Sequence, residues 1–403
     1  MEAPPLARPT GPSAPPPTLL LVALTAVAPM SIDLCLPSLP EMTRVFGAQV
    51  SQVQLILSVF IGGFAVAQPI YGPLSDRFGR RPVLLGGMAV YLAASLFCLA
   101  APSIEALILG RFLQALGGCA GPVLARAIVR DLYPRNQAAR VLSTMASAMA
   151  LGPAIAPFLG GNLQAWFGWR ANFVVLVLLG AATLVAGWGL LAETNRHRDP
   201  RALDPATILD NYCRLLGDRL FLGYSLTLSF AFGGLFAFIS GGAFVLIDVL
   251  GVTPRLFGFS FVPAALGFMA GSFAGSRLTQ RVGLERLVRL GVGLGLAGGL
   301  VLAGLAVGGV QTVVAVMAPI CVVFFSTGLV LPNGTAAALS PHPNIAGSAS
   351  ALVGCLQMAT GAAAGWLVGH LHNGTTLAMA GVICAMQLAA AVVHWRLLSR
   401  PAS

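Results

Sequence analysis

Apolar runs long enough to cross a bilayer recur along almost the whole chain, separated by short polar segments. Each run holds about 20 residues or more, which as a helix would span the roughly 30 Å of hydrocarbon in a membrane. The pattern predicts twelve transmembrane helices near residues 18–40, 51–71, 83–102, 104–129, 140–162, 170–191, 220–247, 255–276, 286–308, 311–336, 346–369 and 374–395. We therefore expect an all-α integral membrane protein.

One long polar segment, residues 193–219, lies between the sixth and seventh predicted helices. It predicts two six-helix halves, 18–192 and 220–396, joined by a cytoplasmic linker. The Pro-rich segment 1–17 is expected to be a disordered cytoplasmic tail, and 397–403 a second tail.

The two halves share a short sequence pattern. DRFGRR follows the second predicted helix and QRVGLER follows the eighth, so Gly283 corresponds to Gly79. Gln280 stands where the first half has Asp76, and the second copy therefore lacks the acid. Two six-helix halves with short turns are the plan of secondary transporters, whose substrate site lies near the middle of the membrane.

Composition and charge agree with a membrane location. The chain is 57% hydrophobic and only 9% charged, and all 23 of its basic residues are arginine. If the N-terminus is cytoplasmic, 19 of these arginines lie on the cytoplasmic side, which predicts that both termini are cytoplasmic. Because the arginines lie in the turns between helices, the net charge of +10 indicates membrane orientation and not nucleic-acid binding.

The residues that enzymes and metal sites need do not form recognisable patterns. Seven cysteines are scattered singly, without a CxxC or Cys/His spacing. The five histidines lie mainly in loops, and no nucleophile–base spacing or P-loop lysine is present. We expect no enzymatic activity, no metal and no cofactor.

Three motifs occur in the order typical of one transporter family. The segment GPLSDRFGRRP matches G-x-L-x-D-R-x-G-R-R at Gly72, Leu74, Asp76, Arg77, Gly79, Arg80 and Arg81. The fourth predicted helix carries R-x-x-Q-x-x-G at Arg111, Gln114 and Gly117. The fifth carries Gly152, Pro153, Pro157, Gly160 and Gly161.

These motifs resemble those of the major facilitator superfamily. The segments SIDLCLPSLP, RAIVRDLYP and AGSASALVG make the chain similar to its Bcr/CflA drug-resistance transporters. The resemblance implies proton-coupled export of small molecules across a bacterial inner membrane. It also implies that the 72–81 segment is a latch for one access state, and that the fifth helix is a pliable helix that seals the cavity.

Asp33 and Arg111 are the convincing charged residues within the predicted spans. Burying a charge in hydrocarbon costs about 2.5–3.5 kcal/mol on insertion scales, so such residues are rare. Both lie roughly 10 Å below the outer boundary, a depth that permits them to pair. We expect Asp33 to take up and release the transported proton, with Arg111 competing for the carboxylate. The alternatives are a static ion pair or an interfacial Asp33 facing water.

Membrane anchoring explains the three arginines of the 72–81 segment but leaves Asp76 without a role. An acid at this position can cap a neighbouring helix or pair with an arginine. Its expected surroundings are charged residues near the inner end of the fourth helix: Arg126, Arg130 and Asp131.

The residues that select the substrate are the least defined. Helix packing is the favoured explanation for each of the candidate cavity residues, which are Gln54, Gln114, Phe232, Phe236, Gln357 and Met358. With few charges in the membrane, the cavity should be mostly apolar and suit neutral or weakly polar compounds such as antibiotics. We expect a monomer in the lipid bilayer, with protons and a small molecule as its partners.

Other functions remain open on this fold. One is proton-coupled import or export of a metabolite such as a nucleobase, amino acid or sugar. Another is a transporter-like sensor or channel, which the Asp33/Arg111 pair disfavours.

Overall fold

The computed structural model describes residues 16–195, 198–200 and 202–398, except for the side chains of Asn344 and of residues 135, 136, 139, 143, 146–151, 153 and 154. The first part of the chain forms α1 (Thr18–Asp33), η1 (Leu36–Ser38), α2 (Leu39–Phe46), α3 (Val50–Phe78), α4 (Arg80–Leu99), α5 (Ile104–Gly118), α6 (Ala120–Leu132), α7 (Arg135–Phe167) and α8 (Arg170–Leu190). The second part forms α9 (Pro205–Gly217), α10 (Arg219–Ala243), η2 (Phe244–Val249), α11 (Pro254–Val282), α12 (Leu284–Val307), α13 (Val313–Leu339), η3 (Pro343–Ile345), α14 (Ala346–His370) and α15 (Leu377–Leu398).

The predicted all-α membrane fold is confirmed. Among the described residues, eleven helical spans are long and apolar enough to cross a membrane, and they match eleven of the twelve predicted. The remaining predicted span, 140–162, lies within α7, whose 33 residues give ample length to cross.

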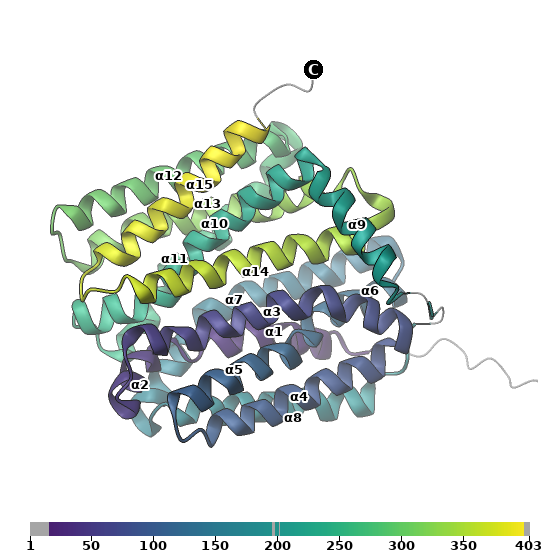
Figure 1. The fold of residues 1–403 in the computed structure, drawn as a ribbon, viewed down its shortest axis with the longest axis horizontal. Helices are drawn as coiled ribbons and strands as arrows, with labels where there is room; N and C mark the ends of the chain where they lie inside the picture. Colours follow the sequence, from purple (N-terminus) through teal and green to yellow (C-terminus); the bar gives the residue numbers. More distant parts are fainter. Residues whose placement is uncertain (1–15, 196–197, 201, 399–403) are drawn as a thin grey trace, which may run out of the picture.

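The helices form two groups that lie side by side (Figure 1). One group contains α1 to α8, the other contains α10 to α15, and α9 crosses between them at one end of the bundle. The groups meet along a seam where α3 packs against α14 and α7 packs against α11.

The 72–81 segment was left between the predicted helices 51–71 and 83–102, but in the structure it is helical apart from Gly79. Helix α3 continues through Pro73 to Phe78, and α4 begins at Arg80. Only Gly79 separates them, with a φ of 104° that favours glycine. Gly283 separates α11 from α12 in the same way, with a φ of 89°. The repeat seen in the sequence therefore marks the same backbone turn in both halves.

The first predicted helix, 18–40, is also interrupted. Helix α1 ends at Asp33, and the chain continues through η1 into α2. Pro37 and Pro40 lie at the second positions of η1 and α2, within the first turn, where backbone N–H groups lack an intrahelical partner and a missing N–H costs little. This break places Asp33 at the end of a helix in the interior of the protein.

The linker contains a helix that the polar pattern did not predict. Asp204 caps α9 by accepting hydrogen bonds from the Ala206 backbone N–H (3.3 Å) and the Thr207 hydroxyl (2.7 Å). Pro205 occupies the first helical position, and Leu215 is buried against the second half. Asp-Pro at this point was a readable signal for a helix start.

Close helix packing depends on particular glycines, and α4 offers a matched pair. A Cβ at Gly87 would meet the Ala120 side chain of α6, the Tyr71 hydroxyl and the Gly117 carbonyl. A Cβ at the adjacent Gly86 would meet nothing within 4 Å.

We predict that Gly87→Ala lowers thermal stability, whereas Gly86→Ala leaves it unchanged or raises it. Overpacking a tight contact costs about 1–3 kcal/mol, and replacing an unconstrained helical glycine by alanine gains about 0.5–1 kcal/mol. Thermal unfolding of the two purified variants in one detergent measures the difference. Equal melting temperatures would contradict the packing described here.

Candidate functional site

The guanidinium of Arg111 lies wholly inside the first half of the protein, on α5. Its side chain is 0% exposed. One amino group donates to the Ser31 carbonyl of α1 at 2.8 Å, and the other donates to Gln114 Oε1. Nε donates a long hydrogen bond of 3.5 Å to the Ile56 carbonyl of α3, and the guanidinium carbon lies 4.2 Å from the centre of the Phe60 ring. Arg111 thus ties α1 and α3 to α5.

The contact with Ser31 follows from the end of α1. The last four carbonyls of a helix lack an intrahelical donor, and a cation near them is favourable. Leu34 N–H donates to the Met30 carbonyl and Cys35 N–H donates to the Ile32 carbonyl. Arg111 supplies the donor for the carbonyl of Ser31, which lies between them in sequence.

Asp33 lies two residues beyond Ser31 and is 3% exposed. Within the part of the chain that the structure describes, its carboxylate makes no hydrogen bond or ion pair. Asp33 and Arg111 were predicted at equal depth, which permits them to pair, but in this structure Arg111 is held by neutral acceptors instead. Asp33 and Arg111 are therefore brought to the same break in α1 without forming a salt bridge.

Neutral polar side chains extend the Arg111 network into α4. Gln114 Nε2 donates to the Ser95 hydroxyl at 2.7 Å, and the Ser95 hydroxyl donates to the Tyr91 carbonyl at 2.7 Å. The Tyr91 and Ser31 hydroxyls are 2.8 Å apart. Gln114 belongs to this network and not to an open cavity. Ser31, Tyr91 and Ser95 were not among the predicted site residues, although Ser31 begins the SIDLCLPSLP segment.

The motif glycines of α7 pack on α1 on either side of Asp33. A Cβ at Gly152 would lie 3.5 Å from Pro29, and one at Gly160 would clash with the Leu34 carbonyl. At Gly161 it would clash with the Pro254 carbonyl of α11. Helix α7 therefore contacts both the break in α1 and the second half. Of the two motif prolines, Pro157 is buried, and the side chain of Pro153 lies outside the described residues.

Arg80 is the centre of the 72–81 segment, at the end of α3 and the start of α4. Its side chain pairs with Asp76 and, through Nε, with Asp131 of α6 at 2.9 Å. It also donates to the Ser75 hydroxyl at 2.6 Å. Asp131 was expected to lie nearby, but Asp76 pairs within its own segment and not with the two arginines proposed for it, Arg126 and Arg130. Arg126 instead donates to the Pro122 carbonyl.

Glu193 holds the start of α4, a role that the sequence analysis missed. Its two oxygens accept hydrogen bonds from the backbone N–H groups of Arg80 (2.9 Å) and Arg81 (3.2 Å). A carboxylate is favourable at a helix N-terminus because it satisfies free N–H groups and complements the helix dipole. A Cβ at Gly79 would also collide with Glu193, so both the positive φ and this contact require glycine at this position.

The remaining motif residues flank this contact. Gly72 has open space around it, Arg77 lies over the Phe78 ring, and Arg81 lies over the Trp188 ring.

Three of the proposed cavity residues, Gln54, Phe232 and Phe236, lie near the seam between the halves. Gln54 is fully buried on α3 and donates to the Ser240 carbonyl of α10 at 3.3 Å. Phe232 and Phe236 of α10 stack with ring centres 6.1 Å apart. Gln357 and Met358 are half-buried on α14.

Comparisons with known proteins agree with this architecture. The profile of the Major Facilitator Superfamily matches residues 21–366. The chain is 32% identical over 386 residues to the bicyclomycin resistance protein homolog of Haemophilus influenzae, covering 95% of this chain and 96% of that protein. It is 33% identical over 342 residues to multidrug resistance protein D of Escherichia coli, covering 84% of each.

Two further comparisons add breadth. The chloramphenicol resistance protein of Pseudomonas aeruginosa is 32% identical over 342 residues, covering 84% of this chain and 80% of that protein. Among solved structures, an inward-facing, occupied bacterial homolog of the human lysosomal transporter Spinster superposes with a TM-score of 0.73, covering 96% of this chain and 98% of that one. Its sequence identity of 15% supports the fold alone.

The superfamily profile matches most of the chain, and the drug-resistance relatives align with it over most of their length. This chain therefore belongs to the major facilitator superfamily, and within it to the Bcr/CflA-type drug-resistance transporters.

Proposed function

We propose that this protein exports small, neutral or weakly polar antibiotics across the bacterial inner membrane in exchange for protons. The relatives named for bicyclomycin, chloramphenicol and multidrug resistance support the direction and the class of substrate. The scarcity of charge inside the membrane supports a preference for uncharged compounds. Residues 18–192 and 220–396 act as the two moving halves, 193–219 links them, both termini are cytoplasmic, and the monomer is the working unit.

The buried, unpaired carboxylate of Asp33 carries this proposal. An ionised carboxylate without a partner is costly in a low-dielectric interior, so burial favours its neutral, proton-bound form. When water reaches the break in α1, the proton can leave and the carboxylate can turn to Arg111. Movement of α7, whose glycines contact this break, then links the proton to the seam with α11.

The driving force is sufficient for resistance. One proton moving inward across about 100 mV releases roughly 2.3 kcal/mol, and a pH difference of one unit adds about 1.4 kcal/mol. One-for-one exchange would therefore sustain a drug gradient of a few hundred-fold.

The second part of the proposal is that Asp76, Arg80, Asp131 and Glu193 form the latch that holds one access state. The contacts among them join α3, α4, α6 and the start of the linker. Since the linker leads to the second half, their rupture would free the two halves to move.

We predict that Asp33→Asn abolishes proton-driven accumulation of chloramphenicol in inverted vesicles with an acidic lumen, while the amount of protein in the membrane is unchanged. Asparagine keeps the shape of the side chain but cannot carry the proton. Asp210→Asn, which alters an exposed acid of α9, is the matched control and should transport normally. Undiminished accumulation with Asp33→Asn would remove this residue from proton coupling.

We predict that Glu193→Ala lowers both the melting temperature and the rate of transport. Loss of a helix cap costs about 0.5–2 kcal/mol, and here it also loosens the latch. Glu105→Ala, an exposed acid in the first turn of α5, serves as control. A Glu193→Ala protein that melts and transports like the control would rule out this latch contact.

A further inference from the structure

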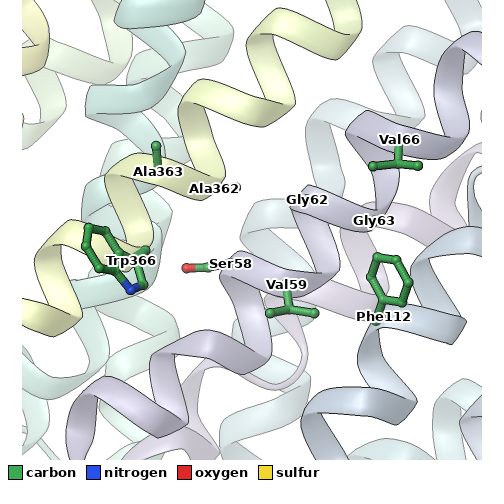
Figure 2. Close-up of a pocket in the computed structure, with 9 residues that line it drawn as sticks. All are labelled: Ser58, Val59, Gly62, Gly63, Val66, Phe112, Ala362, Ala363 and Trp366. Atoms are coloured by element: carbon green, nitrogen blue, oxygen red, sulfur yellow. The ribbon is translucent and has the colours of Figure 1, made fainter.

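Exposed apolar side chains cover much of the outer surface of the spans. The groove between α3 and α14 is an example, and its lining residues include Val59, Val66, Phe112 and Trp366 (Figure 2). The turn between α11 and α12 differs, because exposed arginines follow the exposed apolar residues there. Helix α10 leaves the end of the bundle that α9 crosses and α11 returns to it, so this turn lies at the same end as α9 (Figure 1).

Helix α11 presents a row of three exposed side chains that changes from apolar to cationic. Phe273, Arg277 and Arg281 follow one another at four-residue spacing, which places them on one face of the helix. Phe273 is 61% exposed, and the guanidinium carbon of Arg277 lies 4.9 Å from the centre of its ring. The two charged members of the row are the ones nearest to Gly283, which follows the end of α11.

Helix α12 presents a similar row in the opposite order. Arg286, Leu290 and Leu294 are exposed at the same four-residue spacing and run from the turn into the span. Arg289, which is also exposed, lies about one turn after Arg286. Because Gly283 alone separates the two helices, both rows bring their arginines to the same turn. The arginine patch is defined as the four cations at this turn: Arg277, Arg281, Arg286 and Arg289.

The charge of the arginine patch is not neutralised by the protein. Within the described residues, none of its four guanidinium groups belongs to an ion pair. Glu285 is the one acid in the segment 277–289, so four arginines and one acid give this turn a net charge of +3. The matching turn of the first half is different, because Arg80 there pairs with Asp76 and Asp131.

The order of side chains in the two rows matches the order of chemical groups in an anionic phospholipid. Guanidinium groups bind phosphate oxygens through several N–H donors. The exposed apolar side chains that lie one or two turns further into the span offer a surface to acyl chains. A soluble anion would use the arginines alone and leave Phe273, Leu290 and Leu294 uncovered.

From this arrangement we propose that the arginine patch binds the headgroups of anionic phospholipids, whose acyl chains lie against Phe273, Leu290 and Leu294. Bound lipid then stabilises the folded protein, because it binds the assembled turn and not an unfolded chain. The proposal does not depend on the export function.

The test follows the melting temperature of the purified protein in a neutral detergent while phosphatidylglycerol, an anionic phospholipid, is added. Phosphatidylethanolamine, which has no net charge, is the lipid control, and inorganic phosphate tests a free anion. We expect phosphatidylglycerol to raise the melting temperature and neither control to reproduce the rise. The rise should be smaller at high salt, because salt screens exposed charges.

The double variant Arg277→Gln/Arg286→Gln removes one cation from each helix. Each lost arginine should increase the phosphatidylglycerol concentration that gives half of the rise by about fivefold. Arg277→Lys/Arg286→Lys keeps both charges and should retain most of the response. Arg214→Gln is the matched control and should respond like the wild type, because Arg214 already pairs with Asp210 at 2.7 Å.

Native mass spectrometry counts the lipids that the protein retains, and this second measurement does not depend on stability. From an equal mixture, the wild type should retain more phosphatidylglycerol than phosphatidylethanolamine, and Arg277→Gln/Arg286→Gln should lose this preference. An unchanged preference or an undiminished rise in that double variant would overturn the proposal, as would an equal rise with inorganic phosphate in the wild type. Neither measurement uses transport, so these results decide the lipid site whether or not export is observed.

Discussion

A single buried guanidinium constrains the first half of this transporter. Removing a charge from water is expensive, and the cost is recovered only where every donor finds an acceptor. Each of the three Arg111 nitrogens donates one hydrogen bond, to the helix-terminal Ser31 carbonyl, to the Gln114 amide oxygen and to the Ile56 carbonyl, and the guanidinium also lies over the Phe60 ring. The break in α1 exposes the Ser31 carbonyl, so the interruption of the helix and the burial of Arg111 depend on each other. The same break places a carboxylate, Asp33, where it is buried without a partner.

The proposed proton-coupling site and the proposed latch lie in separate places. Asp33 and Arg111 lie at the break in α1, whereas Arg80, Asp131 and Glu193 hold the far end of α3 against α4 and α6. Helix α3 connects these two places. Its Ile56 carbonyl accepts a hydrogen bond from Arg111, and its last residues belong to the 72–81 segment. A change at either place can therefore reach the other through one continuous helix of 29 residues.

The sequence predicted what depends on local pattern. Apolar runs located the helices, and the shared glycine of the two halves located the turns at Gly79 and Gly283, because few other residues adopt a φ near 90–100° there. Contacts between segments that are distant in sequence could not be predicted from the local pattern. Glu193 is far in sequence from the helix that it caps, and Arg111 selects the Ser31 carbonyl through a break that hydrophobicity does not reveal. The helix in the linker was missed although its Asp-Pro start was visible, because the segment was judged on polarity alone.

Three polar side chains at the seam between the halves each have a buried oxygen without a hydrogen-bond partner. Among the described residues, buried polar atoms without partners include Gln54 Oε1, Ser58 Oγ and Gln68 Oε1, all on α3. Each is close to a glycine of α14, namely Gly369, Gly365 and Gly354. An unpaired buried polar group costs about 1–3 kcal/mol, so the packed seam carries a cost that water or cargo can remove when the halves part. In the Arg111 network, by contrast, every polar side chain has a hydrogen-bond partner. That difference favours motion at the α3–α14 contact over distortion of the Arg111 network, and alternating access requires motion between the halves.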